Sequence, residues 1–222
     1  MGANALDSNT TASNNTAVGY FSLSTNTTGT YNVALGTSAL QANIGASNNT
    51  ALGYATLYDN TTGANNVAVG YQSLKANTTG HSNVAVGMNA LRTTITSVAQ
   101  TAVGFNALAV ATGHYNTALG YEALGSNSTA TENVAIGANA AASTTTGNLN
   151  VSVGSHALLD NTTGLRNTSV GAYALSNNTT ASDNVAVGES SLITNTTGAN
   201  NVAVGKSALA ANTTASNNTA VG

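Results

Sequence analysis

The sequence predicts an all-β fold, a β-solenoid of the parallel β-roll or β-helix kind with thirteen coils of about 17 residues. A glycine recurs every 17 residues, apart from one 16-residue step. Each unit also carries a short alternating segment, with Val or Thr at one position, Ala or Ser at the next, and Val, Leu or Ile after that. A unit of this size must stack on its neighbours to bury an apolar face. The units begin at Gly2, Gly19, Gly36, Gly53, Gly70, Gly87, Gly104, Gly120, Gly137, Gly154, Gly171, Gly188 and Gly205. No linker interrupts this order, so we expect residues 1–222 to form a single repeat domain.

We number each unit from its first glycine, which is position 1. Positions 14 to 17 and the next glycine, as in residues 66–70 (Asn-Val-Ala-Val-Gly), predict a short strand, because side chains alternate between the faces of a strand. We expect its aliphatic side chains, including Val69 and Val86, to stack as a ladder in the core. The asparagines at position 14, including Asn66 and Asn83, are expected to form an amide ladder, each side chain donating to the next.

The rest of the unit contains a corner and a segment of ambiguous structure. Residues 77–80 (Asn-Thr-Thr-Gly) are turn formers and predict a corner. The preceding stretch, such as residues 71–75, fits a second short strand or a helical turn. In either case we expect the leucine at position 5 to point inward. Leu74 and Leu91 are the leucines of two successive units.

The first glycine of each unit, as at Gly70 and Gly87, predicts a corner that needs a positive φ or a close backbone approach. The 16-residue unit, residues 104–119, lacks its residue within 109–113. A surface corner tolerates such a deletion, which agrees with a corner in this region.

The composition argues against several classes of function. Only 5% of the residues are charged, the net charge is −3, and there is no cysteine. Few groups can therefore carry acid–base chemistry, and no thiol can act as nucleophile or soft metal ligand. Four basic residues are too few for a phosphate-binding surface, and no apolar run can span a bilayer. We expect no enzyme activity, catalytic residues, cofactor, metal, nucleic-acid partner or membrane insertion.

The scattered titratable residues agree with this expectation. His81 and His114 share position 12 but lie two units apart, and His156 is at position 3. Asp59 and Asp160 share position 7, six units apart. Metal ligands and acid–base pairs must converge within a few ångströms, so we expect these residues to be surface groups.

Two files of side chains are candidates for a contact face, where a file is the row that residues at one position form along successive units. One is the Thr-Thr file at positions 9 and 10, including Thr61, Thr62, Thr78 and Thr79. The other is the file of aromatic residues at position 2. It includes Tyr54 and Tyr71, which we expect to cover the core edge, with binding of sugars or a partner chain as the alternative.

The Asn-Thr-Thr corners also create Asn-Xaa-Ser/Thr sequons, the acceptor motif for N-glycosylation. Turn preference alone produces the same motif, so the sequence does not require glycosylation. These sequons include Asn26, Asn60, Asn77, Asn161, Asn195 and Asn212.

The strand motif resembles the head repeats of trimeric autotransporter adhesins, which stack as a left-handed parallel β-roll in a three-chain assembly. The matching segments are residues 66–70, 83–87, 133–137 and 201–205. The whole unit, as in residues 49–63, is similar to tandem arrays of bacterial and phage tail-fibre-like surface proteins. The resemblance implies a left-handed solenoid that forms trimers or filaments. The repeat here is longer than the adhesin repeat, and the sequence shows no stalk, anchor or signal peptide.

The chain starts and stops in phase with the repeat, without capping units, so we expect a fragment of a longer fibre or a subunit that stacks end to end. The functional hypothesis is a non-enzymatic structural component of an extracellular or virion-surface fibre or adhesin. Its partners would be further copies of itself, and possible additional partners are host surface glycans or proteins. The alternative is an ice-binding or glycan-binding solenoid that uses the Thr-Thr or Tyr file, since regular hydroxyl rows resemble those of ice-binding proteins.

Overall fold

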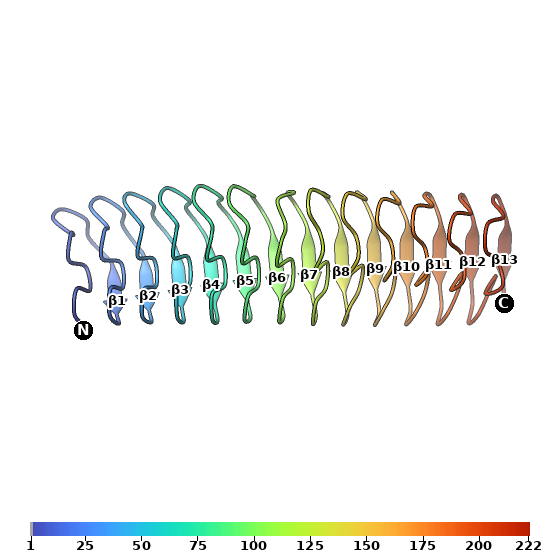
Figure 1. Cartoon of the computed structure of the whole chain (residues 1–222), viewed down its shortest axis with the longest axis horizontal. Helices are drawn as coiled ribbons and strands as arrows, with labels where there is room; N and C mark the ends of the chain where they lie inside the picture. The colour runs from blue at the N-terminus through green and yellow to red at the C-terminus, as the bar shows by residue number, and fades with distance from the viewer. Residues whose placement is uncertain (1) are drawn as a thin grey trace. The chain divides into compact units, whose positions relative to one another are not determined.

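The computed structural model describes residues 2–222 and confirms the predicted fold class. It is an all-β solenoid in which thirteen parallel strands, each of three residues, follow one another in chain order (Figure 1). The strands are β1 (Thr16–Val18), β2 (Val33–Leu35), β3 (Thr50–Leu52), β4 (Val67–Val69), β5 (Val84–Val86), β6 (Thr101–Val103), β7 (Thr117–Leu119), β8 (Val134–Ile136), β9 (Val151–Val153), β10 (Thr168–Val170), β11 (Val185–Val187), β12 (Val202–Val204) and β13 (Thr219–Val221). The left-handed sense of the solenoid, which the resemblance implies, stays a prediction.

The chain divides into two compact units, Met1–Thr112 with β1 to β6 and Gly113–Gly222 with β7 to β13. Their boundary falls in the 16-residue coil, at the corner that lacks one residue. Within each unit the strands pair in register at one coil per step, so that Val67 pairs with Val84 and Ala68 with Ala85. Equivalent residues of successive coils therefore lie side by side.

The segment between the glycine corner and the Asn-Thr-Thr corner is neither a strand nor a helical turn. It consists of two successive tight turns: the amide of Ala39 donates to the carbonyl of Gly36 at 3.3 Å, and the amide of Asn43 to that of Leu40 at 3.2 Å. The backbone is left-handed at positions 3 and 5, and again at position 13. In the coil that begins at Gly70, φ is 53° at Gln72, 49° at Leu74 and 60° at Ser82.

The core is narrow, and it is filled by one leucine per coil, replaced by Ala141 in the coil that begins at Gly137, together with small and amide side chains. Leu74 and Leu91 are fully buried, as predicted. The middle residue of each strand, alanine except for Ser152 in β9 and Ser169 in β10, faces the core from the sheet. Seventeen residues enclose little volume, and the leucine takes most of it. Only a small residue therefore fits opposite, from the strand.

This arrangement corrects the prediction for the aliphatic side chains of the strands. The first and third residues of each strand point outward, so the ladder that contains Val69 and Val86 lies on the outer face of the sheet. Leu35, in the same file, is 49% exposed. The predicted alternation is confirmed, but its inner and outer faces are the reverse of those predicted.

The position 1 glycines meet both requirements predicted for them. Gly70 has a φ of 122°, and a Cβ atom on it would lie 2.7 Å from the carbonyl oxygen of Gly87. A side chain at this corner would therefore collide with the next coil's backbone. Among the described residues, no helix is long and apolar enough to cross a membrane.

Candidate functional site

The position 14 asparagines form the predicted ladder, with a richer bonding pattern than expected. The Oδ1 atom of Asn66 accepts the backbone amide of Asn83 at 3.0 Å and its Nδ2 at 3.1 Å. The Nδ2 of Asn66 in turn donates to the carbonyl of Gly80 at 2.9 Å. The buried side chain of Asn66 thus satisfies a backbone amide and a corner carbonyl of the following coil.

A second asparagine ladder runs along position 8, for which only a corner is predicted from the sequence. Asn77 donates to the Oδ1 of Asn60 at 2.7 Å and to the carbonyl of Gly80 at 3.0 Å. The Gly80 carbonyl is therefore held by both ladders. The signal in the sequence is the recurrence of asparagine at position 8, which turn preference alone also accounts for.

The second ladder also settles the accessibility of the sequons in the folded chain. The side chains of Asn26, Asn60, Asn77, Asn161 and Asn195 are fully buried, and Asn212 is half-buried. The Nδ2 atom that would carry a glycan donates a hydrogen bond inside the coil in each case. Glycosylation of a buried sequon would require the coil to open.

The Thr-Thr file has one engaged and one exposed member per coil. The hydroxyl of Thr61 donates to the carbonyl of Thr78 at 3.1 Å, and that of Thr78 to the carbonyl of Ile95 at 3.3 Å. Thr62 and Thr79 are exposed. In the second unit, position 10 is threonine in six successive coils, which makes this file its most regular exposed row. These residues are Thr129, Thr146, Thr163, Thr180, Thr197 and Thr214.

The position 2 aromatic side chains lie on the surface. Tyr54 is 50% exposed and Tyr71 is 46% exposed, and their rings stack with centroids 5.3 Å apart. The two rings thus form a small aromatic platform, of which about half remains accessible to a partner.

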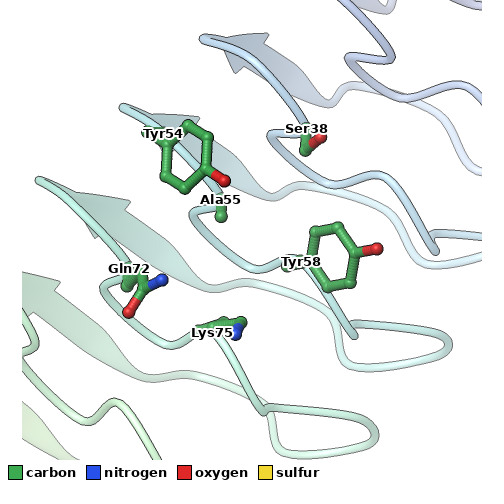
Figure 2. A pocket seen from close by; sticks show the side chains of 6 residues that line it. All are labelled: Ser38, Tyr54, Ala55, Tyr58, Gln72 and Lys75. Carbon is green, nitrogen blue, oxygen red and sulfur yellow. The ribbon is translucent and has the colours of Figure 1, made fainter.

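Beside Tyr54 lies a cavity of about 300 Å³, within the first unit. Its lining comes from three successive coils. Figure 2 shows Ala55 between the rings of Tyr54 and Tyr58, with Gln72 and Lys75 along the next coil. The lining residues are Ser38, Tyr54, Ala55, Tyr58, Gln72 and Lys75.

Four charged residues of the second unit form two ion pairs between adjacent coils, which were not among the predicted features. Arg166 and Asp183 share position 13 in adjacent coils and form a bidentate ion pair, with distances of 2.6 and 2.9 Å. Hydrogen bonding from Arg166 lowers the pKa of the Asp183 carboxyl, and Asp183 raises that of the guanidinium. Lys206 and Glu189, both at position 2, approach to 3.0 Å.

The remaining titratable residues stay dispersed. His156 stacks on Tyr173 at 5.0 Å, and His81 and His114 belong to different coils and different units. Within residues 2–222, no three His, Asp or Glu side chains gather in a way that could hold a metal ion.

Comparison with known proteins adds no relative. No protein-family model matches the chain, and no curated protein matches its sequence. The resemblance to adhesin and tail-fibre repeats therefore rests on the repeat motifs of the sequence alone.

Proposed function

We propose that this chain is a non-enzymatic structural component of an extracellular fibre or adhesin and that it self-associates. The observation that carries the proposal is the outer face of the sheet. Positions 15 and 17 present only valine, leucine, isoleucine and threonine to solvent, without a charge in either file. The most exposed aliphatic side chains are those of Val18, Val33, Leu35, Val67, Leu119, Ile136, Val151, Val204 and Val221.

Contiguous exposed apolar surface of this kind is typical of protein–protein contact sites. The side chains stand in register at the strand spacing of about 4.8 Å, so a second copy would meet a regular, flat surface. β-Branched and leucine side chains lose little rotamer freedom on burial, which lowers the entropic penalty of such a contact. Self-association through this face would bury the valine ladder that the single chain leaves outside.

The bonding between successive coils also supports a structural role in a fibre. Successive coils are joined by strand pairing and by turn hydrogen bonds, and also by two ladders wherever asparagine occupies positions 8 and 14 of adjacent coils. The buried polar groups are thus used to hold successive coils together, as a structural repeat requires.

Because the chain contains no cysteine, introduced cysteines can report on the contact directly. Leu35→Cys and Leu119→Cys place a thiol on the outer face, whereas Ser82→Cys places one at exposed position 13. A short bismaleimide should join copies of the first two variants into covalent dimers or higher species, and should leave the third monomeric. Equal cross-linking of all three variants would remove the outer face as the contact surface.

A second candidate function is favoured by the position 10 threonine row of the second unit, which offers exposed methyl and hydroxyl groups at a constant spacing. Such a row could order water and bind ice. Thermal hysteresis that is lost in Thr163→Tyr and Thr180→Tyr would support this function. Absence of ice shaping by the wild-type chain at high concentration would exclude it.

A further inference from the structure

We propose that the cavity beside Tyr54 is a binding site for an acidic saccharide unit, a pyranose that carries a carboxylate. This inference goes beyond the structural function and does not depend on self-association. It begins from two residues of one coil that depart from the pattern of the repeat. Ala55 is the only alanine at position 3 in the chain, and Tyr58 is the only aromatic residue at position 6.

These two residues create the cavity. In all of the remaining coils, position 3 holds a larger or polar side chain. The small side chain of Ala55 leaves that space empty. Ala55 itself is 3% exposed and forms the floor, while the rings of Tyr54 and Tyr58 stand on either side of it (Figure 2). The volume of about 300 Å³ lies at the lower end of the range for small-molecule sites, roughly 300–1,000 Å³, which suits a single sugar ring.

The aromatic walls match the chemistry of a pyranose. A sugar ring has an apolar C–H face that packs on an aromatic ring, and hydroxyls at its rim that need hydrogen-bonding partners. The stack of Tyr54 on Tyr71, with an interplanar angle of 13°, holds the Tyr54 ring in place before a ligand arrives. The Gln72 amide, the Ser38 hydroxyl and the Tyr58 phenol supply donors and acceptors around the rim.

Lys75 selects for a negative charge. Its Nζ atom lies 6.0 Å from the centroid of the Tyr58 ring, at the cavity wall. Within residues 2–222, the two basic residues of the second unit are each paired with a carboxylate, whereas Lys75 forms no ion pair. The neighbouring carboxylate, Asp59, does not line the cavity. The ammonium is therefore available for a ligand carboxylate, in a charge-assisted hydrogen bond.

The test is a titration of the ¹⁵N-labelled full chain with the methyl glycosides of glucuronic acid and N-acetylneuraminic acid, with methyl glucoside as the neutral probe. We expect at least one acidic probe to bind in the millimolar range and to shift the amide signals of residues 54–58 and 72–75. Methyl glucoside should bind about tenfold more weakly, because it lacks the contact with Lys75.

Two variants make the test specific. Ala55→Gln fills the cavity with the residue that position 3 holds in the next coil, where Gln72 has the same left-handed backbone, so the fold should be retained. Lys75→Met keeps the side-chain stem but removes the charge. Each should weaken acidic-probe binding about tenfold or more. The controls Ser190→Gln, at position 3 of the second unit, and Arg92→Met, at position 6, should bind like the wild type.

Three results would overturn the proposal. One is the absence of signal shifts with both acidic probes. The second is binding that survives Ala55→Gln, which would place the ligand elsewhere. The third is equal affinity for the neutral and acidic glycosides, which would remove the role of Lys75.

Discussion

The side chains of Asn60 and Asn77, one coil apart, are joined by a 2.7 Å hydrogen bond inside the solenoid. The bond depends on an asparagine in both coils, and the ladder is interrupted where another residue takes position 8. The Oδ1 of Asn77 has no partner because the next coil has Thr94. Within the second unit, the coil after Asn127 has Thr144 at position 8, and both polar atoms of the Asn127 side chain are unsatisfied.

Repair of this interruption should stabilise the protein. In Thr144→Asn the new side chain would donate to Asn127 and accept from Asn161, and it would replace a buried hydroxyl that has no partner. We expect a gain of about 1–2 kcal/mol in the free energy of unfolding, measured by denaturant titration. The matched control, Asn161→Thr, should destabilise by a similar amount. A loss of stability in Thr144→Asn would show that the ladder does not hold the coils together.

The glycine corner should tolerate no side chain. Gly70→Ala places a Cβ atom 2.7 Å from a backbone oxygen and imposes a φ of 122° on an L-residue, so we expect a loss of about 3 kcal/mol or more. Gly45→Ala is the control. Its Cβ would meet only the hydroxyl of Thr28, at 3.0 Å, and the change should stay within about 0.5 kcal/mol. Thermal unfolding of both variants measures the difference, and equal losses would contradict the close approach of the corners.

The inner and outer assignments predict unequal effects of the same substitution in two files. Leu74→Asp buries a charge in the core and should cost more than about 3 kcal/mol. Val86→Asp places the charge on the half-buried outer face, where we expect a loss of about 1 kcal/mol in the single chain. Ala210→Lys, at variable position 6, should stay within about 0.5 kcal/mol. Equal losses for Leu74→Asp and Val86→Asp would return the valine ladder to the core.

The Arg166–Asp183 pair predicts a local pH dependence. Because Arg166 lowers the pKa of Asp183 in the folded chain, the stabilisation by this pair is present at neutral pH and is lost as the pH falls through that lowered pKa. The pair is exposed, so the effect on global stability should be small. An NMR titration of the Asp183 carboxyl should show a higher midpoint in Arg166→Gln. An unchanged midpoint would mean that the pair does not persist in solution.

The sequence predicts the coil more reliably than the orientation of its side chains. Periodicity alone identified the solenoid, the strand in each unit, the inward leucine and the position 14 ladder, because a stacked repeat places equivalent residues side by side. A three-residue strand does not indicate which of its faces is inside. Valine is the more hydrophobic residue and is therefore predicted to face the core, whereas the narrow interior admits only the smaller alanine.

The turns were missed for a different reason, although the sequence does contain a signal for them. Positions 3, 5 and 13 hold no valine, isoleucine or threonine in any coil, in a chain with 36 threonines. The structure gives these positions a left-handed backbone, which β-branched residues resist. The cavity arises from single substitutions, Ala55 and Tyr58, and a method that looks for what is repeated does not detect a site made by an exception.

The central claim is that the outer face of the sheet joins copies of this chain. Absolute mass by size-exclusion chromatography with light scattering tests it most directly, on the wild type and on Leu35→Lys/Leu119→Lys. We predict that the wild-type mass is two or more times 21.8 kDa. The variant should be a folded monomer, because self-association would bury its two charges without partners in the contact. A wild-type chain that is monomeric at every accessible concentration would contradict the account.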